Sequence, residues 1–283
     1  FSAGGKRLRP GIVLLLSRAL DPAGELSLRH RRLAQITEMI HTASLVHDDV
    51  VDEANTRRGV PTVHSRFNSR VAVLAGDFLF AQSSWHLANL DDLEVVKLLS
   101  RVIMDLAEGE IRQGLFRYDT GQSLETYLEK SYWKTASLIA NSAKAAGVLS
   151  ELERDQLNQL HSFGRQLGLA FQIVDDILDF TGSDDQLGKP AASDLASGTL
   201  TAPVIYAMEE HPSLAVLIER EFSEPDDLDQ ALGLVRQSQG IQRARALAES
   251  MARESTTNLK FLPASASRDA LMELPDFVLS RLY

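Results

Sequence analysis

Residues 45–59 read LVHDDVVDEANTRRG, and residues 171–182 read FQIVDDILDFTG. Each segment contains two adjacent aspartates and a third one four positions after the first, set among apolar residues. Residues four apart in an α-helix lie about 40° apart around its axis, so Asp48 and Asp52 share one helix face. Asp175 and Asp179 share a face in the same way, and Asp49 and Asp176 flank the two pairs. The repeated pattern predicts two apolar helices, each with carboxylates along one side.

Apolar residues recur at three- and four-residue spacing along almost the whole chain, as at Leu33, Ile36 and Ile40, which is typical of amphipathic helices. We find no strand-like alternation flanked by turn residues. The sequence therefore predicts an all-α chain of about ten helices, in which Trp85 and Trp133 belong to the core. The expected breaks are at residues 21–24, 55–61, 119–123, 181–190, 211–212, 223–227 and 262–263. None of them resembles a domain linker, so we expect one domain over residues 1–283.

The composition is that of a globular protein, with 44% hydrophobic and 24% charged residues. A net charge of -10 argues against nucleic acid as a partner, because nucleic acid requires a basic face. The absence of cysteine excludes disulfides and thiolate chemistry. No apolar run reaches the roughly 18 to 20 residues of a transmembrane helix. The chain starts at Phe1 rather than at methionine, and we expect one or more helices upstream of it.

Two carboxylate pairs on facing helices would suit a hard divalent cation, above all Mg²⁺, which keeps water ligands and binds substrate phosphates. The cations Arg57 and Arg58 directly after the first cluster point to the same ligand, a diphosphate. A single cluster of this kind can equally be a solvated acidic helix end, but two matching clusters make that reading much weaker. Glu38-x-x-His41 has the spacing of a di-iron site, but the second such motif that this site requires is absent.

Several motifs together resemble one known family. GGKRLRP at residues 4–10, HDDVVD at 47–52 with RRG at 57–59, Lys134-Thr135, FQIVDDILD at 171–179, and GKP at 188–190 followed by Asp194 stand in the order found in trans-isoprenyl diphosphate synthases, the polyprenyl synthetases. Within that family the chain is most similar to the long-chain, solanesyl-type enzymes of cyanobacteria and plastids. The resemblance implies the isoprenoid synthase fold, a single large helical bundle around a central apolar cavity. It also implies a homodimer in the cytoplasm, or in the plastid stroma of a eukaryote.

The resemblance assigns roles to individual residues. It implies that Asp48, Asp52 and Asp175 bind about three Mg²⁺ ions when substrate is present, and that Asp49, Asp176 and Asp179 hold metal-bound water. Arg57, Lys134 and Lys189 match residues that bind the allylic diphosphate, and Lys6, Arg9, His41 and Arg58 match those that bind isopentenyl diphosphate. Thr135 and Gln172 match groups beside the reacting carbons. Thr199 stands where many members have a lysine.

The implied reaction is a Mg²⁺-dependent condensation of isopentenyl diphosphate with geranyl, farnesyl or geranylgeranyl diphosphate. It proceeds by ionisation, condensation and elimination, and gives a long all-trans polyprenyl diphosphate for a quinone side chain. One alternative is a shorter-chain geranylgeranyl diphosphate synthase, and another is a non-catalytic partner subunit. A terpene cyclase would need no second diphosphate site, so GGKRLRP and Arg58 argue against it.

The residues before Asp48 bear on product length. Ala43 and Ser44 lie about one helical turn from the aspartates, with Ile40 beyond them. Their small side chains are expected to leave room for a growing chain that passes towards Ala81 and Trp85 on a neighbouring helix. In the family a bulky residue here stops growth early, so the resemblance implies a product of about forty to fifty carbons. The alternative explanation of small residues at these positions is close packing between helices.

Overall fold

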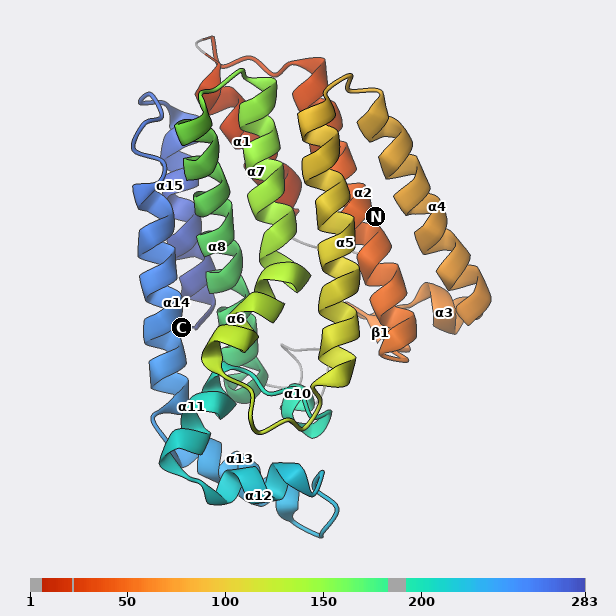
Figure 1. Cartoon of the computed structure of the whole chain (residues 1–283), viewed down its shortest axis with the longest axis vertical. Coiled ribbons are helices and arrows are strands. Elements are labelled where there is room, and N and C mark those ends of the chain that lie inside the picture. Colours follow the sequence, from red (N-terminus) through yellow and green to blue (C-terminus); the bar gives the residue numbers. More distant parts are fainter. Residues whose placement is uncertain (1–6, 22, 183–191, 283) are drawn as a thin grey trace. The chain divides into compact units, whose positions relative to one another are not determined.

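The computed structural model describes residues 7–21, 23–182 and 192–282 (Figure 1). Helices make up most of these residues, and the one sheet is a two-stranded hairpin, so the predicted all-α class is confirmed. The chain forms two compact units. The first comprises residues 1–106, 137–164 and 258–273, and the second comprises residues 107–136, 165–257 and 274–283. Lys6 and Lys189 lie outside the described residues, and a single domain over residues 1–283 stays a prediction.

The first unit is built around one long helix. Its elements are α1 (Leu8–Leu20), α2 (Leu28–Val51), β1 (Thr56–Arg57), β2 (Val60–Pro61), α3 (Val63–Arg66), α4 (Ser69–Ala88), α7 (Ser137–Leu149), and parts of α5 (Leu93–Leu115), α8 (Arg154–Thr181) and α15 (Ala266–Leu279). Helix α2 packs against α1, α4 and α7. Leu33, Ile36 and Ile40 on α2 have no exposed surface, as their spacing predicts.

The second unit contains the remaining parts of α5, α8 and α15 and several shorter helices. These are α6 (Leu124–Ser131), η1 (Tyr132–Ala136), α10 (Ser193–Ala196), α11 (Ala202–Glu210), α12 (Ser213–Glu219), α13 (Asp227–Gln237), α14 (Gly240–Thr257) and η2 (Ser280–Leu282). Helix α11 packs against α12, α13 and α14. Leu167 and Ile173 of α8 are fully buried in this unit.

Most of the predicted breaks between helices are confirmed, but others were missed. Two of the missed breaks separate α4 from α5 and α7 from α8, and neither contains proline or glycine. Asp91 and Glu151 provide the turns by taking positive φ angles of 53° and 57°. At the first break the Asp92 carboxylate also accepts the backbone N–H groups of Glu94 and Val95. A side-chain cap therefore starts α5, where the sequence showed none of the usual helix breakers.

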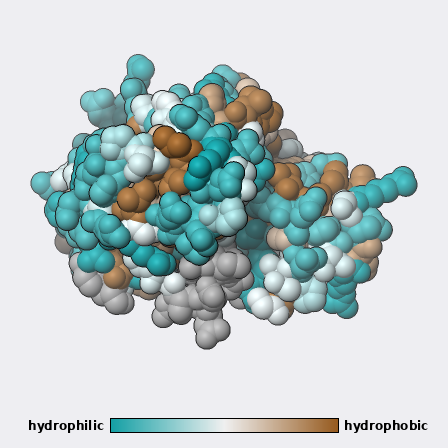
Figure 2. All heavy atoms as spheres, turned by 90° about the horizontal axis from the view of Figure 1, so that it is seen from below, coloured by the Kyte–Doolittle hydropathy of each residue, from teal (hydrophilic) through white to brown (hydrophobic). Residues whose placement is uncertain are grey.

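Close backbone packing joins α8 to α7. A Cβ atom on Gly164 would lie 2.6 Å from the Ala140 Cα atom, so only glycine permits this approach. On the face drawn in Figure 2 most surface residues are hydrophilic, with apolar residues exposed among them. No described helix has the length and apolar character needed to span a lipid bilayer.

One buried histidine links the start of α2 to the end of α7. The His30 Nε2 atom lies 3.1 Å from the Ala146 carbonyl oxygen and 3.2 Å from the Ser150 hydroxyl. Its Nδ1 atom lies 2.8 Å from the hydroxyl of Ser27, the residue that caps α2. Since a carbonyl oxygen only accepts, Nε2 carries the proton and Nδ1 accepts from Ser27. Burial lowers the pKa of His30 below its ordinary value of 6.5.

This lowered pKa predicts a pH-dependent stability. Below pH 6.5 His30 binds a proton in the unfolded chain, whereas the buried ring of the folded chain stays neutral until the pH is lower. The free energy of unfolding therefore falls as the pH decreases. His30→Gln should reduce this acid-dependent loss, although it lowers stability at neutral pH. Urea unfolding at a series of pH values between neutral and mildly acidic measures the difference. Ser150→Ala keeps the His30 ring buried and should retain the wild-type pH dependence of stability. If the free energy of unfolding of His30→Gln fell with decreasing pH as steeply as that of the wild type, the assignment would be contradicted.

Candidate functional site

The first aspartate cluster lies at the carboxyl end of α2. Asp48 is half-buried, Asp49 is buried, and Asp52 is the exposed residue that ends the helix. Asp48 and Asp52 follow each other by one turn on the same face, as the sequence predicts. The Asp49 carboxylate accepts a hydrogen bond of 2.7 Å from Arg57 Nε. One of the predicted cations therefore neutralises one of the predicted carboxylates.

The β1–β2 hairpin holds Arg57 and Arg58 beside this cluster. Arg58 and Gly59 form its two-residue turn and have φ angles of 52° and 75°, the positive values that tight hairpins require. Glycine adopts such angles readily, whereas arginine is uncommon there. Ala54 donates its backbone N–H to the Asp49 carbonyl and so ties the hairpin to the end of α2. Arg57 consequently points back to the helix, while Arg58 is exposed.

Two residues predicted to bind isopentenyl diphosphate are in contact within the first unit. Arg9 on α1 lies with its Nη1 atom 3.1 Å from His41 Nε2 on α2. Burial, and after it the positive charges of Arg9, Arg58 and Arg57 in that order, together lower the pKa of His41 to about 2. The ring is therefore neutral and accepts a hydrogen bond from Arg9. The pKa shift also shows that three cations act on this one position.

The second aspartate cluster lies at the carboxyl end of α8, in the second unit. Asp176 and Asp179 are buried, whereas the Asp175 side chain is 38% exposed. Asp175 Oδ1 lies 2.6 Å from Arg281 Nη1, and the Arg281 guanidinium also stacks at 5.0 Å over the Phe171 ring. Arg245 donates to the Leu282 carbonyl and holds the η2 turn that carries Arg281. The sequence contained no pattern that singled out this arginine.

Asp179 joins α8 to the segment that contains Thr199. Its carboxylate accepts hydrogen bonds from the Ser193 hydroxyl and from the Asp194 backbone N–H, both at 3.1 Å. These contacts fix the amino end of α10. Thr199 in turn donates its backbone N–H to the Asp194 carbonyl at 2.8 Å. Asp179 is therefore occupied with holding α10, and its predicted contact with metal-bound water stays a prediction.

A buried hydrogen-bond chain connects Thr135, Gln172, Asp176 and Tyr127. The Thr135 hydroxyl donates to Gln172 Oε1 at 2.6 Å, and Gln172 Nε2 donates to Asp176 Oδ1 at 2.7 Å. The Tyr127 hydroxyl donates to Asp176 Oδ2 at 2.5 Å. The family resemblance implied that Thr135 and Gln172 both lie beside the reacting carbons, and in the structure their side chains are in contact. Sequence reasoning missed Tyr127, which lies on α6, about two helical turns before the lysine-threonine motif.

A π-helical turn makes the Thr135 contact geometrically possible. Residues Tyr132–Ala136 form η1, which contains Lys134 and Thr135. Such turns are rare and occur frequently at functional sites. Lys134 Nζ lies 2.9 Å from Gln113 Oε1 and 3.2 Å from Glu110 Oε2. These two α5 residues, like Tyr127, are parts of the site that no motif indicated.

The buried charges of the second unit act on one another. Burial and, after it, the Asp194 carboxylate raise the pKa of Asp176, the hydrogen bonds from Tyr127 and Gln172 lower it, and the net result is a pKa of about 7. Lys130 is also buried, and burial lowers its pKa, against the attraction of Asp176 and Asp194. Carboxylates and a lysine with shifted pKa values that lie close together in a buried environment are typical of functional sites.

The donor set fits magnesium chemically. Carboxylate oxygens are the ligands that Mg²⁺ prefers, and it fills its remaining positions with water or phosphate oxygens. In the described residues no three histidine, aspartate or glutamate side chains are arranged to hold a metal ion by themselves. A shared metal site would combine residues of both units, so it stays a prediction.

The residues expected to limit product length lie on α2. Ile40 and Ala43 have no exposed surface, and Ser44, whose hydroxyl donates to the His41 carbonyl, is half-buried. Trp133 is 9% exposed, as expected for the core, but Trp85 is 62% exposed. The prediction that Trp85 belongs to the core is therefore wrong, because its side chain lies on the outer face of α4.

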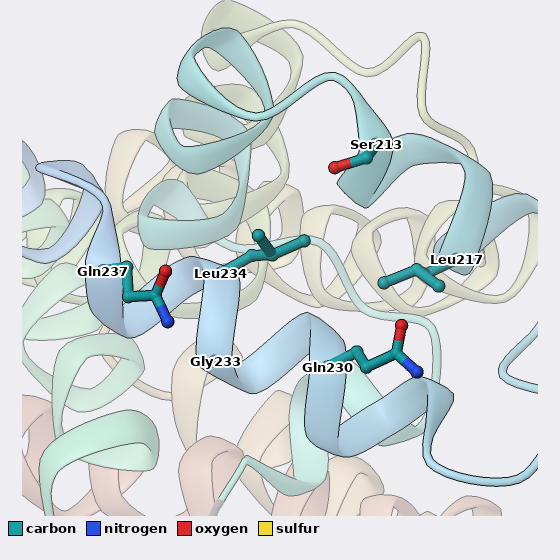
Figure 3. Close-up of a pocket in the computed structure, with 6 residues that line it drawn as sticks. All are labelled: Ser213, Leu217, Gln230, Gly233, Leu234 and Gln237. Carbon is teal, nitrogen blue, oxygen red and sulfur yellow. The ribbon is translucent and has the colours of Figure 1, made fainter.

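A pocket of about 400 Å³ lies between α12 and α13 (Figure 3). Its lining consists of Ser213, Leu217, Gln230, Gly233, Leu234 and Gln237. None of these residues is charged, so the pocket is unsuited to a diphosphate. It also contains no predicted site residue.

Comparison with known proteins gives consistent matches. The family model described as polyprenyl synthetase matches residues 1–235. A "Prenyl transferase" of Synechocystis sp. is 66% identical over all of this chain and 88% of its own length. "Solanesyl diphosphate synthase 2, chloroplastic" of Arabidopsis thaliana is 55% identical over all of this chain and 68% of its own length.

Solved structures agree with the sequence matches. A decaprenyl diphosphate synthase from Rhodobacter capsulatus superposes with a TM-score of 0.92 at 34% identity, over all of this chain and 88% of that one. The heptaprenyl diphosphate synthase of Staphylococcus aureus gives 0.93 at 33% identity, over 99% and 88%. These matches confirm the expected isoprenoid synthase fold. The chain therefore belongs to the polyprenyl synthetase family.

Proposed function

We propose that this chain is a trans-polyprenyl diphosphate synthase, a prenyltransferase that condenses isopentenyl diphosphate with an allylic prenyl diphosphate. The observation that supports this most is that each unit contains an aspartate cluster beside cations suited to diphosphate. In the first unit Arg57 pairs with Asp49 of the first cluster, and in the second unit Arg281 pairs with Asp175 of the second cluster. Family membership supports the same activity.

Each group of residues has a separate task in this proposal. When bound between Asp48, Asp52 and Asp175, Mg²⁺ would act as a Lewis acid that draws charge from the allylic diphosphate. Arg57, Lys134 and Lys189 bind that diphosphate, and Asp49, Asp176 and Asp179 hold metal-bound water. Arg281 must release Asp175 before this carboxylate can bind a metal, because the two are now paired at 2.6 Å.

The second substrate is assigned to the first unit. Arg9, Arg58 and Lys6 bind the diphosphate of isopentenyl diphosphate, and neutral His41 keeps the Arg9 guanidinium in place. Thr135 and Gln172 face the allylic cation formed by ionisation, which the double bond of isopentenyl diphosphate attacks. Departing pyrophosphate accepts the proton that is then lost. None of these steps requires a nucleophilic side chain, in agreement with a chain that has no cysteine.

Incorporation of radiolabelled isopentenyl diphosphate into extractable lipid tests the proposal. The purified chain with Mg²⁺ and an allylic primer should form product, and chelation of Mg²⁺ should abolish it. Asp175→Ala should lower turnover by orders of magnitude without unfolding the protein, because it removes a metal ligand from a partly exposed position. Asp229→Ala, at an exposed carboxylate on α13, is the control and should be fully active. An inactive wild-type chain would instead indicate a non-catalytic partner subunit.

We also propose that the product is long, of the solanesyl type, and serves as a quinone side chain. The relatives named as solanesyl and decaprenyl diphosphate synthases support a long product. Ala43 and Ser44 have small side chains and lie one turn from Asp48, so they leave space there. Ile40 follows on the next turn. A growing chain would pass these residues, so their size would set the limit of elongation.

Ala43→Phe should therefore shorten the main product while the first condensation remains largely active. Ala34→Phe is a matched control, because nine residues at about 100° each place Ala34 on the opposite face of α2. Both alanines are buried, so both variants should lose comparable stability. Mass analysis of the products decides between them. Equal product lengths in Ala43→Phe and the wild type would place the tunnel elsewhere, and a wild-type product no longer than geranylgeranyl diphosphate would contradict the long-chain proposal.

A homodimer is proposed on a separate observation. Val71, Leu74, Phe78 and Trp85 follow one face of α4 at helical spacing and are 41%, 56%, 62% and 62% exposed. A stripe of large apolar side chains of this kind is typical of a protein interface. Phe78→Glu should shift the protein towards monomer in light scattering after size exclusion. Val216→Glu, at a 58% exposed residue of α12, should leave the oligomeric state unchanged.

We expect the enzyme in the cytoplasm or the plastid stroma, which cell fractionation can check.

A further inference from the structure

Tyr127 shares a buried site with the proposed reaction centre. Its side chain is 1% exposed, Asp176 is 3% exposed and Thr135 is 7% exposed. Tyr127 and Thr135 come from α6 and η1, and Gln172 and Asp176 come from one turn of α8. All four residues belong to the second unit, and consecutive members of the chain are joined by hydrogen bonds of 2.5 to 2.7 Å.

The direction of each hydrogen bond follows from the donors and acceptors available. The Tyr127 hydroxyl and the Gln172 amide nitrogen both donate to the Asp176 carboxylate oxygens. The Gln172 amide is then oriented with Nε2 towards Asp176 and Oε1 towards Thr135. The Thr135 hydroxyl hydrogen is committed to Oε1. Only the lone pairs of the Thr135 oxygen remain to face any other group.

We propose that Tyr127 is a positioning residue that fixes the polarity of the Thr135 hydroxyl through Asp176 and Gln172. Lone pairs directed at an allylic cation stabilise it, whereas a hydroxyl hydrogen in that position repels it. A donor chain set in advance by buried residues needs no rearrangement as the positive charge develops. The inference rests on the proposed function, in which Thr135 and Gln172 face the reacting carbons.

Loss of the Tyr127 hydroxyl would remove a donor from Asp176 Oδ2. A buried acceptor deprived of its donor is costly, so Asp176 would turn towards other donors. Gln172 would lose its fixed orientation, and the Thr135 hydroxyl could then reverse. The substrates would still bind, because the diphosphate contacts are made by other residues. The effect should therefore fall on turnover rather than on the Michaelis constants.

Steady-state kinetics of Tyr127→Phe test the proposal, with kcat and both Michaelis constants measured separately. We expect kcat to fall about tenfold, while the Michaelis constants change less than about threefold. Tyr206→Phe deletes the same atom from another buried tyrosine of the second unit and should keep wild-type kcat. Replacing Tyr127 by 3-fluorotyrosine retains the hydroxyl and should also retain kcat, which controls for folding. A kcat of Tyr127→Phe within twofold of wild type, or a rise in the Michaelis constants alone, would overturn the proposal.

A double-mutant cycle checks the route through Asp176. If Tyr127 acts through this carboxylate, Tyr127→Phe should lower kcat less than about twofold in an Asp176→Asn background. A full tenfold loss in that background would show that Tyr127 acts by another route and would overturn the proposal. Inactivity of the wild type and of Tyr206→Phe would count against the proposed function itself. Activity of both, with Tyr127→Phe unchanged, would count only against the role of Tyr127.

Discussion

The burial of carboxylates at the ends of apolar helices is the constraint on which the arrangement of this protein depends. Asp49, Asp176 and Asp179 each have at most 5% of their surface exposed. An ionised carboxylate in such a position is strongly destabilising unless charges or donors compensate for it. The surrounding elements supply this compensation in a different way for each residue. Their positions follow from that requirement as much as from apolar packing.

Three local irregularities of the backbone provide the compensating groups. The β1–β2 hairpin turns at Arg58 and Gly59 and returns Arg57 to Asp49. The π-helical turn η1 brings Thr135 to Gln172, whose amide binds Asp176. The start of α10 presents donors to Asp179. Regular helices contribute side-chain donors as well, because Tyr127 on α6 and Gln172 on α8 both donate to Asp176.

The same contacts restrict how the site can function. Asp179 is bound to α10 and Asp49 to Arg57, so both have defined orientations without a ligand. Asp175 is different, because its partner Arg281 comes from a separate turn and the pair is partly exposed. Ion pairs between solvent-exposed groups typically contribute about 0.2 to 1 kcal/mol, and this pair is partly exposed. A divalent cation can therefore replace Arg281 at Asp175 much more easily than it could displace the partners of the buried aspartates.

The sequence by itself determined the helical class, the buried face of α2, most of the helix breaks and the family. These follow from periodicity, from proline and glycine, and from short motifs, all of which are local signals. Its motifs also predicted that Thr135 and Gln172 lie beside the same reacting carbons, and the two side chains are in contact although 37 positions separate them. Only the tertiary structure decided that Tyr127, Glu110, Gln113 and Arg281 join them, and that Trp85 faces outward. The physical reason is that a single tyrosine or glutamate on a helix has no local signature, and its partner is chosen by packing between segments far apart in the chain.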